Sequence, residues 1–170
     1  ATVIAAVRGE DAAAVVRESG ADFVIDVSGP NVRDSIREQV KALPLDKPGA
    51  DVVIDSVGGD FFAGAIRAMA WCGRLVVVGF VAGQIPTLKV NYLLLKNITV
   101  MGVQWSDYPE REPETVKRAQ QHIFEMWQQG IVRPIITKNV DFDELPAALA
   151  QFGQGKVRGK TVVTVGKASA

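Results

Sequence analysis

The stretch Asp51–Phe62, DVVIDSVGGDFF, indicates the fold that the rest of the sequence follows. It opens with a continuous apolar run rich in β-branched residues, which is typical of a strand buried on both faces. Two glycines end the run, and apolar residues then recur at helical spacing. A strand, a glycine turn and a helix in that order are the building unit of a parallel sheet covered by helices.

The same alternation extends in both directions along the chain. It predicts a doubly wound α/β fold with a parallel, Rossmann-like sheet, built as a single domain over residues 1–170 with a C-terminal segment over 134–170. Asn31 and Asp143 are the predicted N-caps of two helices, and Gly73 is the predicted end of another. Strands are expected at Thr2–Val7, Asp22–Val27, Asp51–Val57, Arg74–Gly79, Ile98–Val103, Ile135–Val140 and Thr161–Val165, and helices at Glu10–Glu18, Asn31–Leu43, Phe61–Met69, Leu88–Leu95, Glu112–Gln129 and Asp143–Gln151.

Composition narrows the class of protein. The chain has 170 residues, 19 Lys and Arg against 19 Asp and Glu, one His and one Cys. A zero net charge argues against a nucleic-acid partner or an anionic membrane, since both require a clustered basic excess. A single Cys cannot form an internal disulfide, and no apolar stretch is long enough to span a membrane. We therefore expect a cytoplasmic protein, and the start at Ala1 inside an apolar run suggests a fragment.

Ligands of such sheets bind at the carboxyl ends of the strands, so the residues that follow each strand are the candidates. Arg8 follows the first predicted strand, with no acidic residue before it in that strand. A cation at such a strand end can pair with the 2′-phosphate of NADP, whereas an acid would accept from the ribose 2′-OH of NAD. The alternative is that Arg8 is a solvated residue at the start of a helix.

Two glycine-containing loops follow later strands. Ser56 and Val57 precede Gly58 and Gly59, where a ligand could approach the backbone next to a helix N-terminus. The loop Gly79–Gly83 holds an aromatic residue between glycines, which suits a flat ring. The alternatives are a simple strand-to-helix turn and a hydrophobic loop that packs on the next element.

Catalytic and metal-binding signatures are not evident in the sequence. There is no GxGxxG and no phosphate loop. Cys72 has no neighbouring His or Cys and is expected to be an inert buried thiol, and His122 is expected to be a surface residue of the long helix. Asp26 and Asp55 lie near strand ends, but nothing pairs them as acid and base. We therefore expect no catalytic residue and no metal ligand in this chain.

Five stretches in one order resemble a known family. They resemble the C-terminal half of the medium-chain dehydrogenase/reductase superfamily, most closely its zinc-free quinone oxidoreductases. The resemblance covers nearly the whole chain, and it implies that a GroES-like catalytic domain, the first Rossmann strand and the glycine-rich phosphate turn precede it. That first strand would lie between the strands at Thr2–Val7 and Asp51–Val57. The stretches are DVVIDSVGGDFF, GRLVVVGFVAG, IPTLKVNYLLLKNITVMGV, GIVRPIITKNVDFDELPAAL and GKVRGKTVVTV.

The resemblance also implies roles for particular residues. A Lys and a Tyr that some relatives use for the cofactor are replaced here by Ala12 and Val27, which leaves Arg8 as the main 2′-phosphate partner. The implied cofactor is NADP(H). The residues that match the family's cofactor contacts are Arg8, Ser56, Val57, Val78, Gly79, Phe80, Val81 and one of Lys156 and Lys160.

The implied reaction is hydride transfer from NADPH to a quinone or another conjugated carbonyl, with the chain by itself expected to be inactive. The implied assembly is a homodimer through Leu88–Val103, a segment too apolar for an edge that faces water. Two alternatives stay open: a non-catalytic module for nucleotide binding or dimerisation, and a Rossmann-like methyltransferase. Arg8 speaks against the methyltransferase, since an acid at that position would hold the ribose hydroxyls of a methyl donor.

Overall fold

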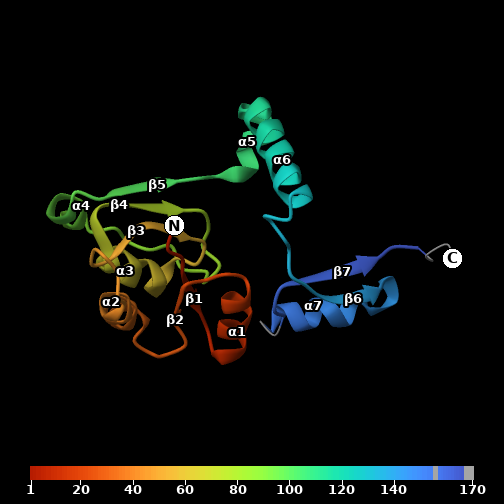
Figure 1. Cartoon of the computed structure of the whole chain (residues 1–170), viewed down its shortest axis with the longest axis horizontal. Coiled ribbons are helices and arrows are strands. Elements are labelled where there is room, and N and C mark those ends of the chain that lie inside the picture. Colours follow the sequence, from red (N-terminus) through yellow and green to blue (C-terminus); the bar gives the residue numbers. More distant parts are fainter. Residues whose placement is uncertain (155–156, 167–170) are drawn as a thin grey trace. The chain divides into compact units, whose positions relative to one another are not determined.

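The computed structural model describes residues 1–154 and 157–166, and its elements alternate as the sequence predicts (Figure 1). Every strand pairing among these residues is parallel, so the predicted α/β fold with parallel sheets is confirmed. The chain divides into two compact units, Ala1–Arg111 and Glu112–Ala170, which are described separately. None of the described helices is long and apolar enough to cross a membrane.

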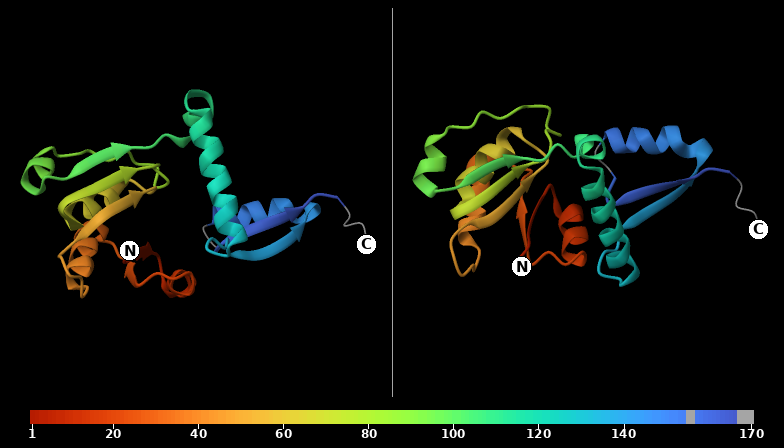
Figure 2. Two further views of the ribbon diagram at one scale, coloured as in Figure 1. Left: turned by 45° about the horizontal axis from the view of Figure 1, so that its top comes forward. Right: turned by 90° about the horizontal axis from the view of Figure 1, so that it is seen from above.

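The first unit contains two parallel sheets. One consists of β1 and β2, and the other has the order β3-β4-β5, with its three strands side by side in Figure 2. Among the described residues, no strand lies between β1 and β3. The elements are β1 (Ile4–Val7), α1 (Glu10–Glu18), β2 (Phe23–Asp26), α2 (Val32–Ala42), β3 (Ala50–Asp55), α3 (Gly59–Ala68), β4 (Met69–Val77), α4 (Asn91–Lys96), β5 (Thr99–Gly102), a 3-10 turn (Trp105–Asp107) and α5 (Tyr108–Arg111).

The core of this unit lies between the sheets and the pair of helices α2 and α3. Leu75 of β4 is fully buried against Phe62 and Ile66 of α3. A second cluster joins Ile25 of β2 to Ile36 of α2, together with Val40 and Ala68. The helix pair therefore contacts both sheets, and α2 and α3 also pack against each other.

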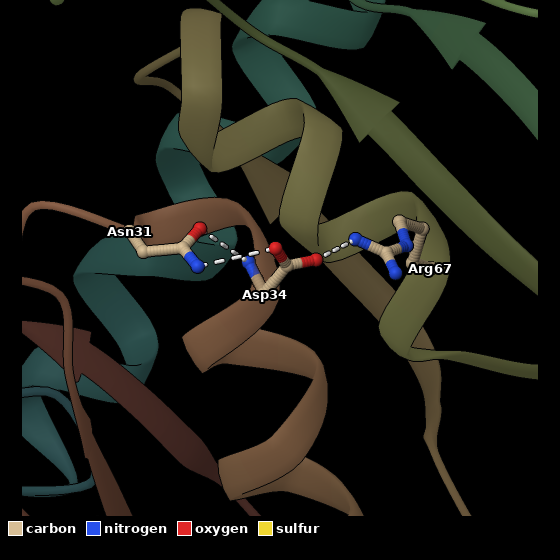
Figure 3. A network of polar contacts seen from close by, with 3 residues as sticks. All are labelled: Asn31, Asp34 and Arg67. Atoms are coloured by element: carbon tan, nitrogen blue, oxygen red, sulfur yellow. Dashed lines mark hydrogen bonds and ion pairs between the residues drawn. The ribbon is translucent and has the colours of Figure 1, made fainter.

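The start of α2 shows how the sequence specifies this helix pair. Asn31 is the N-cap, as predicted, and its side-chain oxygen accepts from the backbone N–H of Asp34 at 3.4 Å. The Asp34 carboxylate accepts from the Asn31 amide at 3.1 Å and from the guanidinium of Arg67 on α3 (Figure 3). Lys96, at the end of α4, donates to the carbonyls of Arg67 at 2.6 Å and Met69 at 2.9 Å. These bonds connect three successive helices.

The boundary between α3 and β4 differs from the prediction. The helix ends at Ala68 and not at Gly73, because β4 begins at Met69 and pairs with Ala50 of β3. The pairing is interrupted between Ala50 and Val52, where β4 carries extra residues between Met69 and Arg74 that form a bulge. Cys72 lies in this bulge with a φ of 60° and is exposed, so the prediction of a buried thiol was wrong.

The prediction that the strands are buried on both faces holds only in part. Val53 of β3 packs against the core with α3, but its neighbours Val52 and Ile54 point to the opposite face. Ile54 is 71 % exposed, and both neighbours line the groove described below. The exposed side of this run borders the gap where the resemblance places a further strand, and no described residue covers it.

The second unit is a parallel pair of strands with two helices. Its long helix starts with Pro at the first position and ends before Gly130, whose φ of 72° suits glycine. His122 on this helix is exposed, as predicted. The capping residue at the start of the next helical segment is Asp141 and not Asp143: the Asp141 side chain and that of Glu144 each accept from the other's backbone N–H. The elements are α6 (Pro113–Gln128), β6 (Ile136–Asp141), a 3-10 turn (Phe142–Glu144), α7 (Leu145–Gly153) and β7 (Lys160–Thr164).

Candidate functional site

A groove of about 1070 Å³ lies in the first unit, between β1 and β3. The resemblance places the family's first Rossmann strand in this position, so the candidate ligand contacts are the residues at the carboxyl ends of the strands and not the groove as a whole. Apolar residues of β1, α2, β3 and α3 form most of its walls. At the carboxyl ends of the strands it is lined by Arg8 after β1 and by Ser56, Val57 and Gly58 after β3, and at the opposite end it is lined by Asp46, Lys47 and Asp51. Val81 and its neighbours complete the lining from the loop after β4. Four of the predicted cofactor residues, Arg8, Ser56, Val57 and Val81, thus line one groove.

Arg8 is an exposed cation at this groove. Its side chain makes no hydrogen bond or ion pair with the described residues, so its charge is available to a ligand. Glu10, the acid nearest to it in sequence on α1, is paired with Arg17 at 2.5 Å. Gly9 lies between Arg8 and Glu10 with φ 78° and ψ 164°, a conformation open essentially only to glycine.

Asp26, at the end of β2, holds this turn. Its Oδ1 accepts from the backbone N–H of Gly9 at 3.3 Å and of Ser28 at 3.0 Å, and its Oδ2 accepts from the Ser28 hydroxyl at 2.6 Å. These bonds hold the pKa of the Asp26 carboxyl below its usual value, and the bond from the Ser28 hydroxyl has the largest effect. The sequence placed Asp26 near a strand end but gave no indication that it reaches the turn after β1.

The turn after β3 is built on a buried carboxylate. Asp55 is fully buried, and its Oδ1 accepts from the backbone N–H of Val57 at 2.8 Å and of Gly58 at 2.9 Å. Its Oδ2 is buried and has no hydrogen-bond partner in the described structure. An Asp that bonds the N–H two residues ahead is a recognised turn pattern, so the DSVGG stretch carried a signal for this role. Asp55 fixes the turn that presents Ser56 and Val57 to the groove.

The loop after β4 lies against this turn. Backbone hydrogen bonds join Val81 N–H to the Ser56 carbonyl at 3.0 Å and Ala82 N–H to the Val57 carbonyl at 2.9 Å. Gly59 N–H donates to the carbonyl of Gln84 at 3.0 Å. Val81 is nevertheless 84 % exposed, and Phe80 is 42 % exposed. The predicted nicotinamide loop therefore has a fixed backbone and an apolar, accessible outer surface.

The remaining predicted residues lie in different places. Val78 is exposed and Gly79 half-buried, both directly after β4 and next to the groove-lining loop. Lys160 begins β7 in the second unit with an exposed side chain, and Lys156 lies outside the described residues. Within the described residues, no three His, Cys, Asp or Glu side chains come together, so they offer no set of zinc ligands.

Parallel strands joined through helices, with turns gathered at the carboxyl ends of the strands, are the architecture of a Rossmann-like α/β fold, whose ligands bind at that edge. A family model described as zinc-binding dehydrogenase matches residues 1–121, and the chain belongs to that family. It corresponds to the C-terminal, cofactor-binding portion of medium-chain dehydrogenases/reductases, as the resemblance implied.

Individual relatives agree with this assignment. Quinone oxidoreductase-like protein 2 of Bos taurus is 34 % identical over 165 residues, which is 97 % of this chain and 46 % of the relative. The mitochondrial NAD(P)H oxidoreductase RTN4IP1 of Mus musculus is 31 % identical, with 95 % of this chain and 41 % of the relative covered. A mycobacterial protein solved in complex with NADPH shares the fold, with a TM-score of 0.80 at 20 % identity, over 95 % of this chain and 49 % of that one. The chain thus spans about half the length of the relatives it matches.

Proposed function

We propose that this chain is the cofactor-binding part of an NADPH-dependent oxidoreductase that transfers hydride to a quinone or another conjugated carbonyl. The observation that carries the proposal is Arg8, an exposed cation with no partner among the described residues at the mouth of the groove. Relatives named as a quinone oxidoreductase-like protein and an NAD(P)H oxidoreductase support the class of reaction. A cytoplasmic location stays a prediction from the sequence.

Each polar feature of the groove has a role in this proposal. Arg8 would pair with the 2′-phosphate, because a guanidinium forms charge-assisted bonds with phosphate oxygens. Ser56 and Val57, fixed by Asp55, would contact the cofactor at the end of β3. The apolar surface of Phe80 and Val81 would lie against the nicotinamide and limit the access of water to it. NADPH, when bound, supplies the hydride, and the protein supplies its position.

The experiment compares two cofactors in the full-length protein. We expect Arg8→Ala to weaken NADPH binding by roughly 10- to 100-fold, since a charge-assisted phosphate contact contributes about 1.5–3 kcal/mol. NADH has no 2′-phosphate, so its dissociation constant should barely change. Titration calorimetry with both cofactors measures this difference directly.

A matched control is Arg33→Ala, which removes another exposed arginine of the first unit that does not line the groove. This variant should bind both cofactors as the parent protein does. An equal loss for NADPH and NADH in Arg8→Ala would show that Arg8 has a structural role only. A thermal-shift comparison of NADPH, NADH and S-adenosylmethionine on the parent protein separates the oxidoreductase from the methyltransferase alternative, because only the latter should be stabilised by the methyl donor.

A further inference from the structure

The turn that presents Arg8 is held from a neighbouring strand. Asp26 is the register partner of Val7, the last residue of β1, and Val27 N–H donates to the Val7 carbonyl at 2.9 Å. The Asp26 carboxylate therefore lies beside the β1–α1 turn, where it accepts from Gly9 N–H at 3.3 Å. The bond joins the end of β2 to the residue that directly follows Arg8.

Asp26 itself is fixed on its other side. The carboxamide of Gln39, on α2, accepts from Asp26 N–H at 2.9 Å and donates to the Asp26 carbonyl at 2.7 Å. The same amide nitrogen of Gln39 donates to the Ser35 hydroxyl at 2.7 Å, which fixes the side chain in turn. The outer edge of β2 pairs with no other described strand, and the Gln39 side chain of α2 bonds its backbone there instead. Gln39 thus fixes the backbone of Asp26, from which the carboxylate reaches the turn.

Gly9 needs such a fixed contact because glycine has the widest choice of backbone conformations. Its carbonyl accepts from Ala13 N–H at 3.1 Å, which is the first bond of α1. Its N–H is held by Asp26. With both polar backbone groups bonded, one conformation of Gly9 is selected, and the direction in which the chain leaves Arg8 is set.

We propose that Asp26 is a positioning residue for Arg8: by fixing the β1–α1 turn, it aims the guanidinium at the 2′-phosphate of the cofactor. This inference rests on the proposed function and adds the residue on which the preference for NADP would depend. It runs against the simple electrostatic expectation, in which a carboxylate beside a phosphate site weakens binding by repulsion. The two effects have opposite signs, so variants of Asp26 can separate them.

The test uses the full-length protein and two small probes, adenosine 2′,5′-bisphosphate and 5′-AMP, which differ by the 2′-phosphate. The readout is the ratio of their dissociation constants, because a general loss of stability would weaken both probes alike. Asp26→Ala removes the Gly9 bond, and we expect it to lower the preference for the 2′-phosphate probe by roughly 2- to 10-fold, the range for one lost hydrogen bond. Asp26→Asn keeps an acceptor oxygen for Gly9 and Ser28 and should retain the preference.

Repulsion predicts a different pattern, in which Asp26→Ala and Asp26→Asn both raise the preference because both remove the charge. That pattern overturns the inference, and so does an unchanged preference in Asp26→Ala. If Asp26→Ala does not fold, Asp26→Glu replaces it, because this variant keeps the charge but moves the carboxylate oxygens one bond further from the backbone. Positioning then predicts a reduced preference for the 2′-phosphate probe, whereas repulsion predicts an unchanged preference.

Arg8→Ala, measured in parallel, separates this inference from the proposal on which it rests. A preference lost in Arg8→Ala but kept in Asp26→Ala overturns the role of Asp26 alone. A preference that survives in Arg8→Ala overturns both the role of Arg8 and that of Asp26.

Discussion

Two glycines show how single residues shape the candidate site. Gly9, after Arg8, has φ 78° and ψ 164°, and Gly58, after Val57, has φ 74° and ψ −157°. Both values fall in a region that essentially only glycine occupies. The two positions differ in the space around them. A Cβ at Gly58 would lie 2.9 Å from the backbone oxygen of Gln84, whereas a Cβ at Gly9 would meet no atom within 4 Å.

This difference makes the two positions a matched pair for mutation. Gly9→Ala adds backbone strain and should lower the free energy of unfolding by about 1–3 kcal/mol. Gly58→Ala adds similar strain and also forces the loop at Gln84 to move, so we expect a clearly larger loss. Urea unfolding of both variants measures the two losses. Equal losses would mean that the loop after β4 can move away from a Cβ at Gly58 without lowering the free energy of unfolding.

The residue scale also shows what sequence reasoning can reach. Arg8, Ser56, Val57 and Val81 were candidates because they follow strands, and the topology of a parallel sheet brings strand ends together. Asp26 and Asp55 were seen but received no role, because their importance depends on which backbone N–H groups their carboxylates reach. Those distances are set by turn geometry and not by the spacing of residues in the sequence.

At the scale of elements, the ion pair between Asp34 and Arg67 links α2 to α3 (Figure 3). Hydrogen bonds from Arg67 and Asn31 lower the pKa of the Asp34 carboxyl, and the bond from Arg67 has the larger effect. A carboxyl with a lowered folded-state pKa stabilises the protein above its unfolded pKa of about 3.9, and this contribution is lost as the pH falls through the folded value.

Arg67→Met should therefore lower the urea midpoint at pH 7, because it removes the partner of Asp34. The difference between variant and parent should shrink below about pH 4 and vanish once Asp34 is protonated in both proteins. Urea unfolding curves of both proteins, collected at several pH values from pH 7 downward, measure how the difference in midpoint decreases. Asp34→Asn is the control, since in that background Arg67→Met should have little effect at any pH. A difference independent of pH would assign Arg67 a packing role instead.

Element boundaries were harder to predict than elements. The helix α1 was predicted with its observed ends, because Gly9 and Gly20 flank a clear amphipathic run. The apolar spacing of α3 was expected to continue through Met69 and the helix to stop at Gly73, whereas it ends at Ala68. In the structure Met69 belongs to the sheet and not to the helix, because it pairs with Ala50 of β3. The local pattern of apolar residues carries no information about that distant partner.

At the scale of the whole molecule, we propose that the segment Leu88–Val103 forms a homodimer interface. Its strand β5 is bonded to β4 along one edge, and no described strand pairs with the other edge. Leu94 and Leu95 of α4 are exposed, and Met101 of β5 is 47 % exposed. An apolar strand edge of this kind is an association site unless another chain covers it. The contact should be isologous, with Ile98–Val103 antiparallel to its own copy.

Met101→Asp tests this interface better than Val100→Asp, because Val100 packs against the core and its replacement would also unfold the protein. We expect sedimentation of the full-length Met101→Asp variant to show a monomer or a precipitate, whereas the parent protein sediments as a dimer at micromolar concentration. Ile85→Asp, an equally drastic change at an exposed residue outside the segment, should leave the dimer intact. A monomeric parent protein would refute the interface.

The open groove between β1 and β3 has a consequence for the way the first unit responds to thermal fluctuations. In an uninterrupted sheet, opening one strand strains the ladder on both of its sides, so amide protons across the sheet exchange with solvent together. Here the described ladders β1–β2 and β3–β4–β5 share no hydrogen bond, and the contacts of α2 with α3 connect them instead. In this chain by itself the two ladders should therefore exchange as separate cooperative units, coupled only through the packing of α2 on α3. A strand between β1 and β3, where the resemblance places the family's first Rossmann strand, would join them into one unit.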